Sequence, residues 1–120
     1  MQIKEYCEKS SRTMAELNNL HLNTYHMLFG MSTEIGELID VFKKDLAYNK
    51  VIDWTNVQEE IGDLLFYIAN FCNINHFDLE DILENNVKKL QTRYPEKFTE
   101  ENAKNRDTDA ERKILQELGY

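Results

Sequence analysis

Cysteine, proline and glycine are scarce in this sequence, and each scarcity excludes a class of structure. The two cysteines, Cys7 and Cys72, are isolated and far apart, so neither a disulfide framework nor a zinc site of the CxxC kind is expected. Cys72 lies in the apolar run FYIANFC, where a small buried thiol fits. With only one proline and four glycines, the sequence has few points at which a helix must break.

Long apolar runs and an excess of positive charge are also absent. No run reaches the roughly 20 apolar residues of a membrane-spanning helix, and the opening residues MQIKEYCEKSSR lack the apolar centre of a signal peptide. Fourteen Lys and Arg face 22 Asp and Glu, a net charge of −8, whereas DNA and anionic membranes need a cationic surface. We therefore expect a cytoplasmic protein with reduced thiols and without nucleic-acid or membrane partners.

Helical periodicity replaces strand-like alternation along most of the chain, which predicts an all-α fold with a bundle of four to five helices. We expect a single domain over residues 1–120, with its core over about 23–95 and a tail over 96–120 that carries a short helix. The predicted helices span residues 3–17, 23–48, 53–75, 78–94 and 109–118. Asp53 or Thr55 can cap the third and Asp78 the fourth, which must end before Pro95.

One motif occurs twice: EIGEL at residues 34–38 returns as EIGDL at 60–64. Each copy places a glycine inside a predicted helix, at a cost of about 1 kcal/mol relative to alanine. The repetition predicts that Gly36 and Gly62 allow two helix backbones to approach closely.

Each copy of the motif also carries two acids three residues apart, Glu34 with Glu37 and Glu60 with Asp63. Acids at this spacing project from one side of a helix, beside the apolar stripe in both copies. If the stripes pack together, four carboxylates converge, and a cation must offset their repulsion. An all-carboxylate set favours Mg²⁺, with Mn²⁺ as a possible substitute; a di-iron site would need Glu-x-x-His, which does not occur. The alternative is an ordinary solvated helix face.

Neutral and cationic side chains on the predicted fourth helix fit a phosphate substrate of such a metal. Asn86, Lys89 and Arg93 follow one another at spacings of three and four and share a face. Lys44 lies seven residues after Glu37 on the same strip, and Tyr67 is placed either to contact a nucleoside or to pack in the core. A face that only confers solubility is the alternative for the charged members.

The sequence resembles the MazG-like all-α nucleoside triphosphate pyrophosphohydrolases. The resemblance lies in ExxE at Glu34–Glu37, ExxD at Glu60–Asp63 and the surrounding segments GMSTEIGELIDVFKK, NVQEEIGDLLFYIA, NNVKKLQTRYPEKF and NRD, over residues 26–107. It implies Mg²⁺ ligands at Glu34, Glu37, Glu60 and Asp63. It also implies that Glu34 or Glu37 activates water, and that substrate contacts lie at Lys44, Tyr67, Asn86, Lys89 and Arg93.

The activity implied by the resemblance is conversion of a (d)NTP to a (d)NMP and pyrophosphate, as a nucleotide-pool house-cleaning enzyme. A homodimer or a dimer of dimers is also implied, and the wide apolar stripes predict the same. The alternatives are a pyrophosphatase specific for phosphoribosyl-ATP, dUTP or dCTP, and a non-catalytic metal-binding helical module that binds a partner.

Overall fold

A computed structural model describes residues 1–117, whose regular elements are helices with no strand, which confirms the all-α class. Its elements are α1 (Ile3–Ser10), the 3-10 turn η1 (Ser11–Thr13), α2 (Leu20–Tyr48), α3 (Trp54–Ile74), α4 (Leu79–Arg93), α5 (Glu100–Lys104) and α6 (Thr108–Gln116). They form two compact units, Met1–Phe77 and the unit that starts at Asp78. No helix among the described residues is long and apolar enough to cross a membrane.

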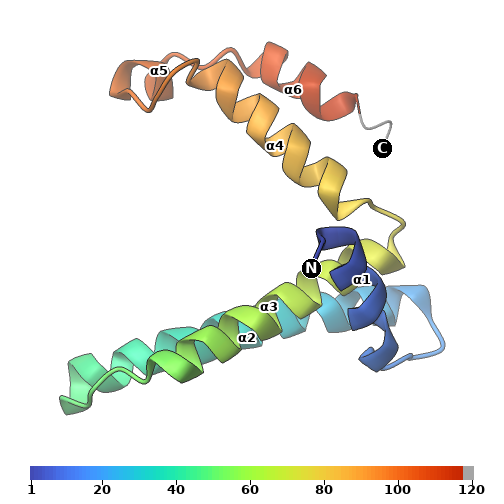
Figure 1. Ribbon diagram of the computed structural model, residues 1–120, viewed down its shortest axis with the longest axis vertical. Coiled ribbons are helices and arrows are strands. Elements are labelled where there is room, and N and C mark those ends of the chain that lie inside the picture. Colours follow the sequence, from blue (N-terminus) through green and yellow to red (C-terminus); the bar gives the residue numbers. More distant parts are fainter. Residues whose placement is uncertain (118–120) are drawn as a thin grey trace. The chain divides into compact units, whose positions relative to one another are not determined.

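The first unit is a long hairpin of α2 and α3, with α1 packed on α3 (Figure 1). Asn19 caps α2 by accepting hydrogen bonds from two backbone N–H groups of its first turn, and Asp53 caps α3 in the same way. Helix α2 ends at Asn49, whose φ of 52° gives the left-handed conformation that asparagine tolerates. These capping residues determine where α2 and α3 begin and where α2 ends.

The core of this unit is small and lies along the hairpin. Its buried apolar side chains are Met27, Val41, Val57, Ala69 and Cys72. The glycine that permits close helix packing is Gly30, because a Cβ there would collide with the ring of Tyr67. A Cβ at Gly36 or Gly62 would meet nothing within 4 Å, so the prediction that the two motif glycines let these backbones approach was wrong.

Helix α1 is tied to α3 by a hydrogen bond that Asn73 Nδ2 donates to the backbone oxygen of Cys7, at 2.9 Å. The predicted first helix over residues 3–17 was too long. The α-helix ends at Ser10, where Ser10 Oγ donates to its own helix at Cys7 O, and η1 follows. Serine and threonine side chains compete for backbone groups in this way and favour helix ends.

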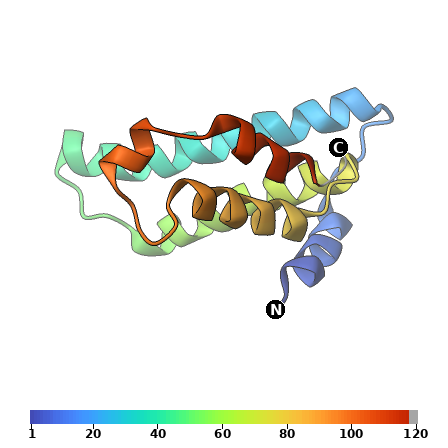
Figure 2. The same cartoon turned by 90° about the horizontal axis from the view of Figure 1, so that it is seen from above.

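In the second unit, α4 lies beside α6, and α5 links them (Figure 2). Asp78 caps α4 as predicted, and α4 ends at Arg93, before the Tyr94–Pro95 step. The tail contains two helices where the sequence predicted one, because Thr99 caps the additional short helix α5. The last helix was predicted to begin at residue 109 and begins one residue earlier, at Thr108. Its predicted end, Leu118, lies outside the described residues.

Candidate metal centre

Three acidic side chains converge between the two arms of the hairpin. Glu34 and Glu37 lie one turn apart on α2, Glu60 lies on α3, and one carboxylate oxygen from each lies within 4.8 Å of the others. Glu60 is only 6% exposed, whereas Glu34 is half-buried and Glu37 is exposed. We call these three residues the acidic cluster.

The carboxylates of the acidic cluster perturb one another. Hydrogen bonding to Glu60 is the main cause that raises the pKa of Glu37 above its ordinary value of 4.5. Hydrogen bonding to Glu34 and then burial raise the pKa of Glu60. Like charges held this close favour either a bound proton or a bound cation.

Two oxygens of the cluster have no hydrogen-bond donor. Oε2 of Glu34 and Oε2 of Glu60 are buried without a partner among the described residues. An unsatisfied buried carboxylate oxygen is costly, and the hard oxygen donors of the cluster are the ligand type that Mg²⁺ and Mn²⁺ prefer. The cluster therefore fits a hard divalent cation.

Asp63, the fourth predicted ligand, is exposed and lies beside the acidic cluster on α3. Its charge is one of the causes that raise the pKa of Glu37 and of Glu60. It also contributes, after burial and Cys7, to the raised pKa of Tyr6 on α1. Tyr6 was not predicted from the sequence, because no regular spacing along the chain relates α1 to the residues of α3 that it contacts.

A comparison with protein-family models matches residues 23–98 to the MazG nucleotide pyrophosphohydrolase domain, which is more than half of the chain. The chain belongs to the MazG family. No curated protein and no solved structure matches it significantly. The MazG match contains the acidic cluster, Asp63 and helix α4, whereas α1, α5 and α6 lie outside it.

The predicted substrate contacts of this MazG chain have different surroundings. Lys44 is exposed and forms an ion pair with Asp40, one turn earlier on α2, at 3.1 Å. Tyr67 is half-buried and packs against Gly30 and edge-on to His26, with ring centroids 6.2 Å apart. The sequence left open whether Tyr67 contacts a nucleoside or packs in the core, and in this structure its ring makes packing contacts.

The other three predicted contacts of the MazG chain lie on α4 in the second unit. Asn86 is exposed and Lys89 is half-buried. The neighbouring Asn85 is 5% exposed, and its side-chain amide donates a hydrogen bond to Ile114 O at 3.2 Å. Arg93 is bound to Glu111 of α6 by a 2.7 Å ion pair.

Glu111 and its second partner, Arg106, were not predicted from the sequence. Arg106 belongs to the NRD segment, which was the available signal. No spacing rule connects these residues with Arg93, because the turn through α5 brings them together.

Proposed function

We propose that the protein is a Mg²⁺-dependent nucleoside triphosphate pyrophosphohydrolase that converts a (d)NTP to a (d)NMP and pyrophosphate. The observation that carries this proposal is the acidic cluster, with its two buried oxygens that lack donors, inside a MazG domain. Conversion of surplus or damaged nucleotides in the cytoplasm is the role that this activity supports.

Glu34, Glu37, Glu60 and Asp63 would hold the cation. When bound, Mg²⁺ offsets the charge of these carboxylates, attracts the triphosphate and makes a coordinated water more acidic. Asp63, beside the cluster on α3, is exposed to solvent, as is Glu37.

The chain's own residues supply the proton transfer. Glu37 or Glu34 accepts a proton from the attacking water as the new oxygen–phosphorus bond forms at the α-phosphorus. The bond from this phosphorus to the bridging oxygen breaks, and pyrophosphate leaves with the bonding electron pair.

Cationic and polar groups would bind the rest of the substrate. Lys89 and Arg93 lie one turn apart on α4, where their charges can stabilise the leaving pyrophosphate. Asn86 provides an amide on the same helix, and Lys44 and Tyr67 on the hairpin are proposed contacts for phosphate and nucleoside.

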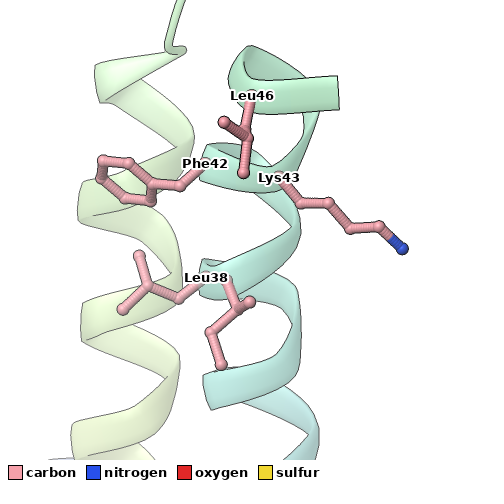
Figure 3. A pocket seen from close by; sticks show the side chains of 5 residues that line it. Leu38, Phe42, Lys43 and Leu46 are labelled. Carbon is pink, nitrogen blue, oxygen red and sulfur yellow. The ribbon is translucent and has the colours of Figure 1, made fainter. Parts of the chain in front are cut away.

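A second copy of the chain is the proposed partner, as a homodimer or a dimer of dimers. The α2–α3 hairpin exposes large apolar side chains, among them Ile39 at 59% and Leu46 at 88%. Leu38, Ile39, Phe42, Lys43 and Leu46 line an open groove of about 620 Å³. Leu38 and Phe42 point toward α3, whereas the Lys43 ammonium points away (Figure 3). Contiguous exposed apolar side chains are typical of a protein interface.

The test is release of pyrophosphate from a panel of nucleoside triphosphates with Mg²⁺, with EDTA as the control. The panel includes the four dNTPs, the four NTPs, dUTP and phosphoribosyl-ATP. Glu37→Gln is expected to abolish turnover while the helical circular dichroism signal persists. Glu59→Gln is the matched control, because Glu59 is an exposed acid on α3 outside the cluster. Absence of pyrophosphate release from every substrate would refute the enzyme and favour a metal-binding helical module.

A further inference from the structure

A buried carboxylate in the second unit holds two arginines from different segments. Glu111 of α6 is 2% exposed. Its Oε1 accepts a hydrogen bond from Arg93 Nε at 2.8 Å and forms an ion pair with Arg93 Nη2 at 2.7 Å, and its Oε2 accepts a hydrogen bond from Arg106 Nε at 3.0 Å. Both oxygens of Glu111 are therefore engaged, and two guanidinium groups are held around one carboxylate.

This arrangement leaves positive charge in excess. Burial alone would raise the pKa of Glu111, but the hydrogen bonds from Arg106 and Arg93 lower it below its ordinary value of 4.5, so Glu111 is ionised at neutral pH. Two guanidinium charges and one carboxylate charge give a local net charge of +1. The Arg106 side chain is 42% exposed and uses only Nε on Glu111, so its terminal amino groups are accessible to a ligand.

The second arginine satisfies Oε2 of the buried Glu111 carboxylate through its Nε alone, so its terminal amino groups are not used in this bond. Helix α6 is already joined to α4 by the hydrogen bond from Asn85 to Ile114 O and by the Arg93–Glu111 ion pair. A guanidinium whose Nε is fixed by a carboxylate presents its remaining donors in a defined plane, which is the geometry that binds phosphate oxygens in a bidentate manner. Arg106 is thus held in place while it remains largely accessible.

We propose that Glu111 is a positioning residue that orients Arg93 and Arg106 as a paired binding site for the pyrophosphate portion of a nucleotide. This inference rests on the proposed function, because the triphosphate substrate and the pyrophosphate product supply the ligand. Arg106 and Glu111 both lie beyond residue 98, where the MazG match ends. The segment that contains α5 and α6 therefore completes a binding site whose other arginine lies inside the matched domain.

The test measures the binding of inorganic pyrophosphate to the full chain by isothermal titration calorimetry. Arg106→Ala is expected to weaken binding about tenfold, the loss of about 1.4 kcal/mol that one charge-assisted contact provides. Arg106→Lys, which keeps the charge but not the planar fork, is expected to recover only part of this affinity. Arg112→Ala is the matched control, because Arg112 is an exposed arginine next to Glu111 on α6, and its affinity should stay within about twofold of the parent.

Glu111→Gln distinguishes positioning from simple charge. The substitution removes a negative charge beside the two arginines, so a site that depended on charge alone would bind pyrophosphate more tightly. If Glu111 positions the arginines, Glu111→Gln binds pyrophosphate more weakly, and KM for the triphosphate rises more than kcat falls. Tighter binding by Glu111→Gln, or equal affinities of Arg106→Ala and Arg112→Ala, would overturn the proposal.

The calorimetric measurement does not depend on turnover. A parent protein that binds pyrophosphate but releases none from any triphosphate would overturn the proposed function and leave this site standing. If the parent protein turns over a triphosphate, but the parent and all these variants bind pyrophosphate with the same affinity, the proposed function stands and this binding site is refuted.

Discussion

Glu60 shows at the scale of one residue why the acidic cluster needs a counter-charge. It is the most buried of the three acids, and one of its oxygens lacks a donor. A buried carboxylate next to two others is favourable only when a proton or a cation is present. The neighbours of Glu60 within the cluster are acids, whose charges add to that of Glu60 and do not neutralise it.

Replacing Glu60 by Gln removes one of these charges and adds an amide donor for its neighbours. We expect the metal-free Glu60→Gln protein to melt at a higher temperature than the parent, because repulsion within the cluster falls. The rise in melting temperature that Mg²⁺ produces in the parent is expected to vanish, and turnover to fall about 100-fold or more. Differential scanning calorimetry with and without Mg²⁺ provides the check. A full Mg²⁺-dependent rise in the variant, equal to that of Glu59→Gln, would contradict Glu60 as a ligand.

The raised pKa values of Glu37 and Glu60 also predict how stability depends on pH. The folded state binds more protons than the unfolded state between the ordinary value of 4.5 and the raised values. The free energy of unfolding of the metal-free protein should therefore fall as pH rises through this window, and the penalty should be absent below about 4.5. Melting temperatures measured across this pH range should show the fall in the parent without Mg²⁺. A double Glu37→Gln, Glu60→Gln variant in which the fall persists unchanged would show that other groups cause it.

At the scale of helices, the close packing of α3 on α2 at Tyr67 requires a glycine at position 30. The ring of Tyr67 occupies the space that a side chain would fill there. Gly30 is buried, whereas Gly36 and Gly62 are exposed and have open space where a Cβ would be. Glycine at position 30 therefore makes room for the Tyr67 ring, whereas glycine at positions 36 and 62 makes room for no neighbouring group.

Alanine substitutions separate the two effects. Gly30→Ala is expected to destabilise the protein by about 1–3 kcal/mol, because the Tyr67 ring must move out of a packed interface. Gly62→Ala is expected to stabilise it by up to about 1 kcal/mol, since alanine favours a helix and meets no obstacle. Urea unfolding of both variants measures the two changes. If Gly30→Ala matched Gly62→Ala, the close packing of Tyr67 on α2 would be excluded.

Helix boundaries were predictable from the sequence where one side chain determines them. Asp53 and Asp78 cap α3 and α4, and the Tyr94–Pro95 step limits α4. The end of α1 and the existence of α5 were not predicted, although Ser10 and Thr99 mark them locally, because short segments without a periodic stripe give only a weak helical signal.

The residues of the candidate site were likewise predictable where a local sequence pattern determines their position, and not where the chain reversal does. The repeated motif identified the three acids of the cluster, because helical spacing places them on facing strips. Glu111 and Arg106 escaped prediction because chain reversal, and not spacing, brings them to Arg93. The prediction for Gly36 and Gly62 was wrong for a related reason, because the sequence showed a repeated glycine but not the space around it.

At the scale of the whole molecule, the first unit buries little for its length. The buried apolar side chains of the hairpin are few, whereas apolar residues such as Phe29, Ile39 and Leu46 are largely exposed. Helices that are apolar on more than one face require a further packing layer. Leu38, Ile39 and Phe42 line a groove in this surface, and we propose that a second hairpin covers it.

A charge placed in this groove should therefore separate the copies. We expect light scattering of the parent at micromolar concentration to give at least twice the chain mass of 14.3 kDa. Ile39→Glu should shift the mass toward a single chain and lower the melting temperature, because a buried unpaired carboxylate opposes association. Gln58→Glu adds the same charge at an exposed polar position of α3 and should leave the mass unchanged. A parent mass of one chain, or association of Ile39→Glu as strong as that of Gln58→Glu, would refute the groove as an interface between copies.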